Sequence, residues 1–242
     1  MRLAEATSTD AAAAETDLAV LPVGSTEQHG PHAPLSTDTL NAAAVAEAGV
    51  AAFDEAVVLS PPIPYGISAE HRRFAGTCWL SPDTFRAVVR EAVESLISHG
   101  WRRVVVVNGH GGNIDALREV AAAVSRTENA HVAAFTWFEA VGEHGARMGH
   151  AGPLETAMLR CHHPELVRDD RVETAAAESS DRWGDWVAGV NLAHDSDEFT
   201  ENGVVGDPTA GDADLGAELT ELAADALADL LAALDKRPLS GD

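Results

Sequence analysis

The sequence predicts an α/β fold in which helices cover both faces of a parallel sheet. Short apolar segments alternate with longer alanine-rich segments that carry apolar residues at helical spacing. The β-branched run at 104–107 has no polar alternation, which is typical of a strand buried on both faces. A glycine-rich turn and a helical pattern follow it, as in a βα unit. At 242 residues the chain is long enough for one sizeable core, so we expect a single α/β domain spanning 1–242.

The first quarter of the chain contains two predicted strands. Residues 1–16 form a polar, alanine-rich lead-in that is compatible with a first helix, and 18–23 is an apolar strand. Residues 39–56 have the periodicity of a helix. A second buried strand is predicted at 57–59, and the proline-rich segment 60–66 that follows it cannot continue a sheet.

The middle of the chain repeats the alternation of helix and strand. Pro82 marks the first turn of a helix predicted at 81–98, because proline is favoured at that position. Strands predicted at 104–107 and 131–136 flank a helix at 114–126. The apolar residues of the first helix recur at helical spacing: Phe85, Val88, Val89, Ala92 and Leu96.

The last third of the chain is expected to contain two helices and a long irregular segment. Pro153 marks the first turn of one helix. Residues 165–199 are polar and acidic and predict irregular structure, and 202–208 is a compact turn. The second helix is long and presents one apolar stripe, which is core or subunit interface: Leu215, Leu219, Leu222, Ala226, Leu230 and Leu234.

The charge balance restricts the partners of the protein. The chain has 39 acidic and 16 basic residues and a net charge of −23, and Lys236 is its single lysine. A surface this acidic argues against nucleic acid and anionic membranes as partners. The acidic, alanine-rich and nearly lysine-free composition favours adaptation to high salt, and the alternative is an ordinary acidic protein.

The cysteines and the N-terminus point to a reducing compartment. Cys78 and Cys161 are far apart and form no CxxC pair, which argues against a disulfide framework. The first ten residues carry acids where a signal peptide needs a basic start and an apolar core. No apolar run approaches the length of a membrane span. We therefore expect a cytoplasmic protein.

Polar residues follow the first predicted strand in an arrangement that suits a metal ion. Glu27 and His29 point to the same side of an extended segment, because side chains alternate along it. The stiff turn at 30–34 can bring Asp38 back to the same centre. The alternative is a solvated loop edge without a ligand.

Two later segments supply further candidates. The glycines around His110 let that side chain turn inward after the strand at 104–107. A phosphate loop is the weaker interpretation of these glycines, because neither GxGxxG nor GxxxxGK[ST] occurs here. His150 lies one tight turn before Glu155, near the start of the helix at Pro153, where both can face a pocket.

Together these residues predict a centre for two divalent cations. Imidazole and carboxylate groups in this mixture suit zinc, manganese or iron(II), with one carboxylate bridging. Paired metals activate a shared water and polarise a carbonyl, so the expected chemistry is hydrolysis. The first-rank ligands are Glu27, His29, Asp38, His110 and Glu155, and the second-rank candidates are His150, His71 and His32.

The chain resembles the creatininase family of metal-dependent amidohydrolases over roughly residues 18–235. The resemblance is carried, in order, by LPVGSTEQHGPHAPLSTD, VVVVNGHGGN, HAGPLETA and GVVGDP. It implies a three-layer α/β/α fold with a mostly parallel sheet, and a two-metal site at the carboxyl ends of the strands. It also implies a homo-oligomer, often a hexamer.

The resemblance also assigns roles to residues. Glu27 and His110 would hold one metal, His29 the other, and Asp38 would bridge them. Glu155 matches a glutamate of the family motif and His150 the histidine of HAG, so these two are the candidate catalytic residues. His150 would be the general acid/base that protonates the leaving nitrogen. The alternative for His150 is a structural role at the start of the helix.

One departure from the family pattern bears on the substrate. Creatinine-hydrolysing members carry a glutamate two residues after the histidine of NGH, where this chain has Gly112. Glu155 is the expected substitute ligand, and creatinine becomes a doubtful substrate. The NGHGGN variant is similar to an archaeal formamidopyrimidine-nucleotide deformylase of riboflavin and deazaflavin biosynthesis and to the peptidase of mycofactocin maturation.

The leading expectation is therefore hydrolysis of a non-peptide amide or formamide in a small molecule, with the deformylase first. The alternatives are creatinine hydrolysis, processing of a short modified peptide, and a non-catalytic metal-binding protein. Arg72 and Arg73 would meet the phosphate of a nucleotide, and the alternative is a pair that serves surface salt bridges. The expected substrate contacts are His71, Arg72, Trp137 and Gly111.

Overall fold

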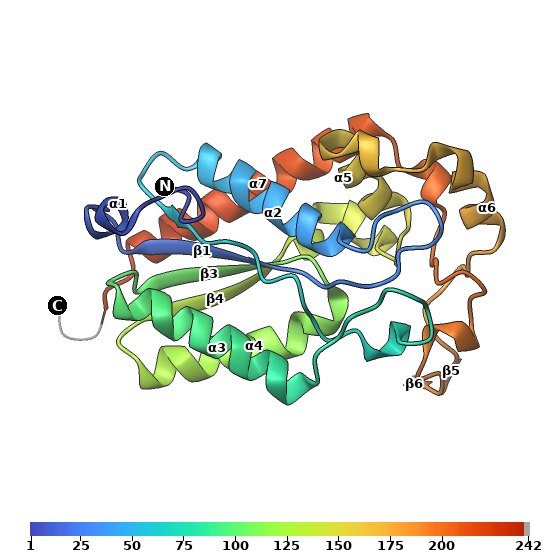
Figure 1. The fold of residues 1–242 in the computed structure, drawn as a ribbon, viewed down its shortest axis with the longest axis horizontal. Helices are drawn as coiled ribbons and strands as arrows, with labels where there is room; N and C mark the ends of the chain where they lie inside the picture. Colours follow the sequence, from blue (N-terminus) through green and yellow to red (C-terminus); the bar gives the residue numbers. More distant parts are fainter. Residues whose placement is uncertain (240–242) are drawn as a thin grey trace.

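The computed structural model describes residues 1–239 and is built around a four-stranded parallel sheet in the order β2-β1-β3-β4 (Figure 1). In the register, Val20 of β1 pairs with Leu59 of β2 and Val105 of β3. Parallel pairing requires helical crossovers, which place helices on both faces of the sheet. The strands are β1 (Leu18–Val23), β2 (Val58–Leu59), β3 (Arg103–Asn108) and β4 (His131–Thr136).

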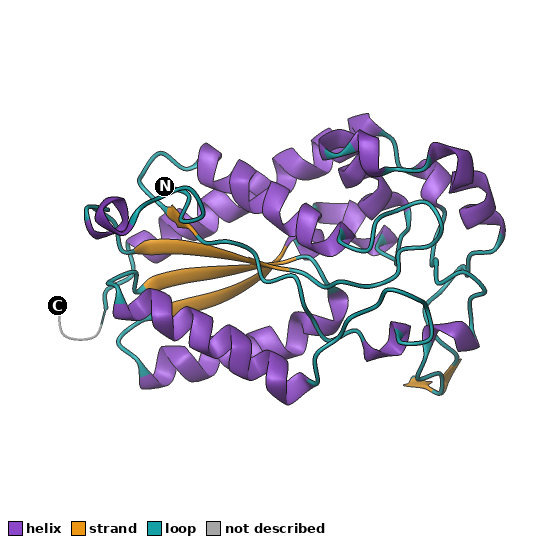
Figure 2. Cartoon of the chain, viewed as in Figure 1, coloured by secondary structure: helices purple, strands orange, loops and turns teal. Residues whose placement is uncertain are grey.

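The helices form two layers, one on each side of the sheet (Figure 2). The first layer contains α2 (Thr37–Ala52), α5 (Pro153–His162) and α7 (Ala213–Asp235). The second contains α3 (Pro82–Ser98) and α4 (Ile114–Thr127). The three-layer α/β/α architecture with a parallel sheet is therefore confirmed.

Alternate strand side chains enter two separate cores. Val20 and Val105 pack among the residues of α2, α5 and α7. Leu21 and Val104 pack on the other face against α3 and α4. Both faces of each central strand are buried, which explains why the runs at 18–23 and 103–108 lack polar alternation.

Side-chain caps fix where the long helices begin. The Ser81 hydroxyl accepts a hydrogen bond from the Thr84 amide, and Pro82 opens α3. The Asp212 carboxylate accepts from the Leu215 amide at the start of α7, at 2.8 Å. Each cap satisfies an amide that has no partner within its helix, so the boundary is set locally.

Two predictions of secondary structure are corrected. The helix expected at 39–56 begins at Thr37 and ends at Ala52, because the Thr37 amide bonds to the Pro34 carbonyl and starts the turn earlier. The segment expected to be irregular at 165–199 contains short elements whose length gives little periodicity. These are α6 (Val172–Ala177) and the hairpin of β5 (Trp186–Val187) and β6 (Val190–Asn191).

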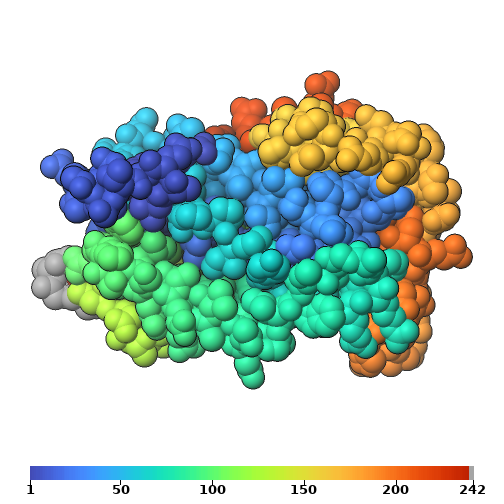
Figure 3. Space-filling view, in the orientation of Figure 1, coloured from blue at the N-terminus to red at the C-terminus, as the bar shows by residue number. Residues whose placement is uncertain are grey.

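The two ends of the molecule come from different parts of the chain (Figure 3). The lead-in, which includes the short helix α1 (Ser8–Ala12), lies at one end. The segment that contains α6, β5 and β6 lies at the other end, beyond the carboxyl ends of the strands. Within residues 1–239, no helix combines the length and apolar character needed to cross a membrane.

Candidate metal centre

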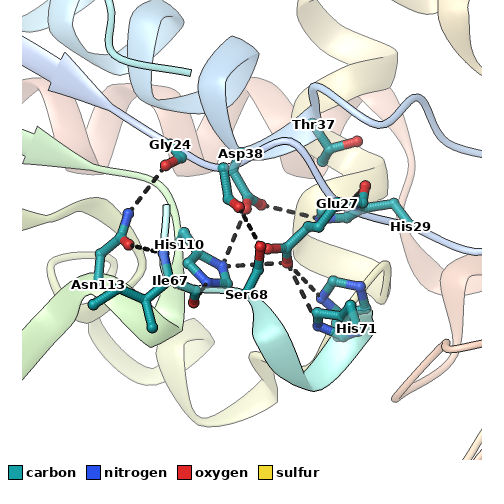
Figure 4. Close-up of polar contacts among 12 residues, drawn as sticks. Gly24, Glu27, His29, Thr37, Asp38, Ile67, Ser68, His71, His110 and Asn113 are labelled. Carbon is teal, nitrogen blue, oxygen red and sulfur yellow. Dashed lines mark hydrogen bonds and ion pairs between the residues drawn. The ribbon is translucent and has the colours of Figure 1, made fainter. Parts of the chain in front are cut away.

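The candidate ligands converge beyond the carboxyl ends of two neighbouring strands (Figure 4). Glu27 and His29 lie on the segment that follows β1, and His110 follows β3. Asp38 lies in the first turn of α2 and Glu155 in the first turn of α5. All five side chains are buried, so the fold has collected three carboxylates and two imidazoles where little solvent reaches them.

Asp38 lies at the middle of this cluster. Its Oδ1 is 3.0 Å from His29 Nε2, and its Oδ2 is 3.1 Å from His110 Nδ1. Glu27 Oε1 is 3.2 Å from the same nitrogen of His110, and Glu155 Oε1 is 3.7 Å from His29 Nε2. The two oxygens of Asp38 thus face two different imidazoles, which is the arrangement of a bridging carboxylate.

The outer nitrogens of His29 and His110 fix the tautomers of both rings. His29 Nδ1 lies 3.2 Å from the carbonyl oxygen of Glu27, and His110 Nε2 lies 2.6 Å from that of Ile67. A carbonyl only accepts, so each outer nitrogen carries a proton and donates it. In the neutral rings the inner nitrogens then present lone pairs to the carboxylates. Metal-ligating histidines share this pattern of an outer N–H bound to a carbonyl.

The buried acceptors lack the donors that would compensate them. Within residues 1–239, both carboxylate oxygens of Glu27 and of Asp38, and Nε2 of His29, have no hydrogen-bond partner. Burying carboxylates without compensation is costly. Burial lowers the pKa of His29, but Asp38 and Glu155 outweigh it and raise that pKa well above its ordinary value. The cluster therefore favours a positive charge, and a divalent cation fits its donor set.

The donor atoms form three overlapping groups, each with its ligand atoms within 4.8 Å of one another. These groups are Glu27, Asp38 and His110; His29, His150 and Glu155; and Glu27, His71 and His150. Oδ1 of Asp38 faces the second group through its 3.0 Å contact with His29. The candidate positions for two metal ions are therefore Glu27, Asp38 and His110 for one, and His29, Asp38 and Glu155 for the other, next to His71 and His150.

His150 presents its unprotonated nitrogen to the cluster. Its Nε2 donates to the carbonyl oxygen of Gln28 at 2.6 Å, and its Nδ1 lies 3.5 Å from Glu27 Oε1. Burial, followed by the nearby His29, lowers the pKa of His150 to about 4. The ring is therefore neutral near pH 7, with Nδ1 able to accept a proton.

Gln28 is a site residue that no sequence pattern indicates. Its Nε2 donates to the carbonyl of Gly203 at 3.0 Å and to His71 Nδ1 at 2.9 Å, and its Oε1 accepts from the Gly30 amide. The proton of His71 is thereby placed on Nε2, which faces Glu27 Oε1 at 3.6 Å. His71 and His150 stack with ring centroids 4.1 Å apart, one presenting a donor and the other an acceptor.

The loop that carries His110 is held by two asparagines. Asn108 accepts from the His110 amide at 3.1 Å and donates to its carbonyl at 2.8 Å. Asn113 donates to the Gly24 carbonyl and accepts from the Ile67 amide. The NGHGGN turn therefore fixes the position of His110 by side-chain bonds to the backbone.

Gly112, which replaces the glutamate expected in creatinine-hydrolysing members, has no space for a side chain. A Cβ there would overlap with the carbonyl of Ile67 and lie 2.6 Å from His110 Nε2. The Glu155 carboxylate reaches the cluster from α5 instead, and its Oε2 accepts from the Ala151 amide at 2.6 Å.

A pocket of about 670 Å³ opens onto the cluster. His71 and Gly111, two of the four residues predicted to contact the substrate, line it. Trp137 and Arg72 do not, and both expectations are corrected. Trp137 is completely buried in the core because its ring packs beneath the first helical layer. Arg72 is turned away to pair with Asp195 at 2.7 Å.

Trp183, from the segment expected to be irregular at 165–199, faces the pocket together with Phe138. Its ring meets His71 and His150 edge-on, at centroid distances of 5.6 and 6.2 Å, and packs against Phe199 at 5.1 Å. No local sequence pattern indicates this contact, because Trp183 reaches the pocket through the fold of the 165–199 segment. His32, a second-rank ligand candidate, instead bonds to Thr156 Oγ1 at 3.0 Å.

Sequence comparisons relate the chain to named enzymes. The family model described as Creatininase: Creatinine amidohydrolase matches residues 4–231. The mycofactocin precursor peptide peptidase of Mycolicibacterium smegmatis is 37% identical over 202 residues, which are 81% of this chain and 76% of that protein. For the same-named protein of Mycobacterium ulcerans the identity is 39% over 166 residues, covering 65% of this chain and 63% of that protein. A creatinine amidohydrolase of Pseudomonas putida is 32% identical over 178 residues, covering 63% and 67%.

Solved structures share the fold. A manganese form of creatininase has a TM-score of 0.80 at 21% identity, covering 98% of this chain and 99% of that chain. A creatininase variant of Zn–Zn type has a TM-score of 0.77 at 22% identity, covering 98% of each chain. The family model spans nearly the whole of this chain, and the four motifs that carry the resemblance all lie within it. The chain belongs to the creatininase family of hydrolases that act on carbon–nitrogen bonds.

Proposed function

We propose that the protein is a two-metal amidohydrolase that cleaves an amide bond in a short peptide. The main observation behind this proposal is the volume of the pocket. Its volume of about 670 Å³ lies within the range of roughly 300–1,000 Å³ that accommodates drug-sized ligands. That is more than a single small ring such as creatinine needs. The 37% identity to a mycofactocin precursor peptide peptidase supports the same choice of substrate.

The cluster supplies ligands for both metals. Glu27, Asp38 and His110 would hold one ion, and His29, Asp38 and Glu155 the other. A pair of divalent cations supplies Lewis-acid polarisation of the scissile carbonyl and an activated water. Asp38 contributes to both positions, so its loss should affect both ions.

Two imidazoles next to the cluster have complementary roles in this proposal. His150 would accept a proton at Nδ1 from the attacking water and return it to the leaving nitrogen, while its Nε2–H stays bonded to the Gln28 carbonyl. His71 presents Nε2–H and orients an acceptor of the substrate. Trp183 covers both rings and limits the access of water.

Metal content, turnover and stability test the proposal together. The purified protein would be stripped with a chelator and reloaded with manganese, zinc or iron(II), and hydrolysis of a short-peptide panel would be followed by mass spectrometry. We expect two ions per chain, a higher melting temperature on loading, and peptide cleavage. Asp38→Asn should lose both ions and all turnover. The control Asp83→Asn, at a fully exposed carboxylate, should match the wild type. Full turnover by Asp38→Asn would contradict the proposal.

A second candidate is deformylation of a formylamino-pyrimidine nucleotide. The two glycines that follow His110 are compatible with it, because the NGHGGN variant resembles such deformylases as well as the mycofactocin peptidase. A nucleotide also matches the pocket volume. Release of formate from that substrate, with no cleavage across the peptide panel, would replace the first proposal. Creatinine serves as the control in both assays, and we expect no creatine from it.

A further inference from the structure

Two arginines lie on the wall of the pocket. Arg147 and Arg182 both line it, and within residues 1–239 neither guanidinium has a carboxylate oxygen within 4.0 Å. The arginines expected on the substrate behave differently: Arg72 and Arg73 both bind Asp195, at 2.7 and 3.1 Å. Arg147 and Arg182, on the wall of the pocket, are therefore the arginines available to a ligand.

The segment that carries Arg147 is fixed next to the catalytic cluster. His150 and Val205 exchange two backbone hydrogen bonds, of 3.0 and 2.8 Å. Gly149 packs so closely that a Cβ there would overlap with the carbonyl of Val205. Arg147 is thus three residues from a rigid backbone contact that also positions His150.

Residues 204–206 bind His150 on one side and the segment that carries Arg182 on the other. The Ser180 amide donates to the Val204 carbonyl at 3.0 Å, and the Gly206 amide donates to the Ser180 carbonyl at 2.9 Å. The Ser180 hydroxyl also donates to the Arg182 carbonyl at 2.7 Å. The residues around Val205 therefore hold both arginine-bearing segments at the pocket.

The other groups on the wall indicate how a ligand would lie. Phe138, Met148 and Trp183 provide apolar surface in the same pocket, and His110, His150 and Glu155 mark the end with the metal ligands. The acidic residues Glu70 and Asp181 also line the pocket, but neither lies within 4.0 Å of a guanidinium. In a chain of net charge −23, two unpaired cations provide a local attraction for an anion.

We propose that Arg147 and Arg182 bind an anionic group of the substrate, while its amide lies at the metal centre and an apolar part lies between them. This inference rests on the amidohydrolase function proposed above. Guanidinium groups pair with carboxylate and phosphate oxygens in a planar, two-point geometry. The anion is therefore the free carboxylate at a peptide terminus or the phosphate of a nucleotide.

Binding of matched probes tests the inference without relying on turnover. Calorimetry on the manganese-loaded protein, at one fixed salt concentration, would compare N-acetyl-phenylalanine with its amide and uridine 5′-monophosphate with uridine. Mass spectrometry would verify that the probes stay intact. We expect the anionic member of one pair to bind about tenfold more tightly, because two partly exposed ion pairs contribute. The pair that shows this preference identifies the anion as carboxylate or phosphate.

The double variant Arg147→Gln/Arg182→Gln should lose that preference and leave the affinity for the neutral probe unchanged. Arg90→Gln is the matched control, because Arg90 is exposed on α3 and does not line this pocket. Equal binding of anionic and neutral probes, or no binding of any probe, would overturn the inference, as would a preference that survives in the double variant. Hydrolysis without charge preference would reject only this inference, and charge preference without hydrolysis would reject only the proposed function.

Discussion

Gln28 shows how one uncharged residue organises several charged or titratable neighbours. Its amide nitrogen donates to the Gly203 carbonyl and to His71 Nδ1, and its backbone carbonyl accepts from His150 Nε2. It therefore determines which nitrogen carries the proton in both stacked imidazoles. Sequence spacing draws attention to its neighbours Glu27 and His29, because acid and imidazole side chains bind metals, whereas an amide is recognised only from its contacts.

Exchanging this amide for a carboxylate tests its role. In Gln28→Glu, His71 would have to donate from Nδ1, which removes the proton from the Nε2 that faces Glu27. We expect kcat to fall about 10- to 100-fold, in the range of other partners of metal-site residues. Activity assays and nitrogen NMR of the histidine tautomers would measure this.

The neighbouring Ser196 provides the control. Its hydroxyl oxygen lies 2.9 Å from His71 Nδ1, but its single proton is donated to the Glu70 carbonyl at 3.1 Å, so the donor to that nitrogen is Gln28 Nε2. Ser196→Ala should reduce kcat less than Gln28→Glu and leave the His71 tautomer unchanged. An unchanged tautomer in Gln28→Glu would show that the amide does not set it.

At the scale of elements, the βα turn after β3 depends on close backbone packing. A Cβ at Gly109 would overlap with the carbonyl oxygen of Asp38 in the first turn of α2. This approach is what places His110 Nδ1 3.1 Å from the Asp38 carboxylate. At the nearby Gly111, an added Cβ would meet nothing within 4 Å, and the residue has no left-handed φ.

The two glycines of this turn should therefore respond differently to alanine. Gly109→Ala should reduce the free energy of unfolding by about 1–3 kcal/mol, the usual result of overpacking, and should lower metal occupancy. Gly111→Ala should be neutral or add about 0.4–1 kcal/mol by restricting the unfolded chain. Urea unfolding and metal analysis would measure both. Equal stability of the two variants would mean that α2 moves to accommodate the methyl group of Gly109→Ala.

The elements that can be predicted are those whose local pattern is strong. The strands at 18–23 and 131–136 are predicted to the residue, and the helix beginning at Pro82 is marked by its proline. The short α6 and the β5–β6 hairpin lie in a polar, acidic segment without an apolar run, so no local pattern indicates them.

The residues of the site can likewise be predicted only where a local pattern in the sequence indicates them. The ligands Glu27, His29 and Asp38 lie close together in the sequence, so their convergence can be predicted from the geometry of one segment. The pairing of Arg72 with Asp195 joins residues 123 positions apart, and the contact of Trp183 with His71 is also long-range. Such contacts are set by the whole fold, so no local pattern in one sequence indicates either of them.

The large negative net charge of the whole molecule lowers its stability through repulsion between carboxylates. The net charge of −23 places many carboxylates at the surface, where they repel one another across water. On α7 a row of exposed acids recurs at helical spacing, and like charges four residues apart destabilise a helix. The row consists of Asp214, Glu218, Glu221, Asp225 and Asp229.

Salt should therefore stabilise this protein. The screening length falls from about 10 Å at 0.1 M salt to about 3 Å at 1 M, which weakens repulsion between exposed carboxylates. We expect the melting temperature to rise steadily with KCl, as adaptation to high salt requires. The variant Glu221→Gln/Asp225→Asn/Asp229→Asn removes three charges of the α7 row, so it should melt higher than the wild type at low salt and gain less from added KCl. A melting temperature that is flat or falls with KCl would mean that the acidic surface is not an adaptation to salt. Equal gains in the two proteins would place the salt-sensitive repulsion outside α7.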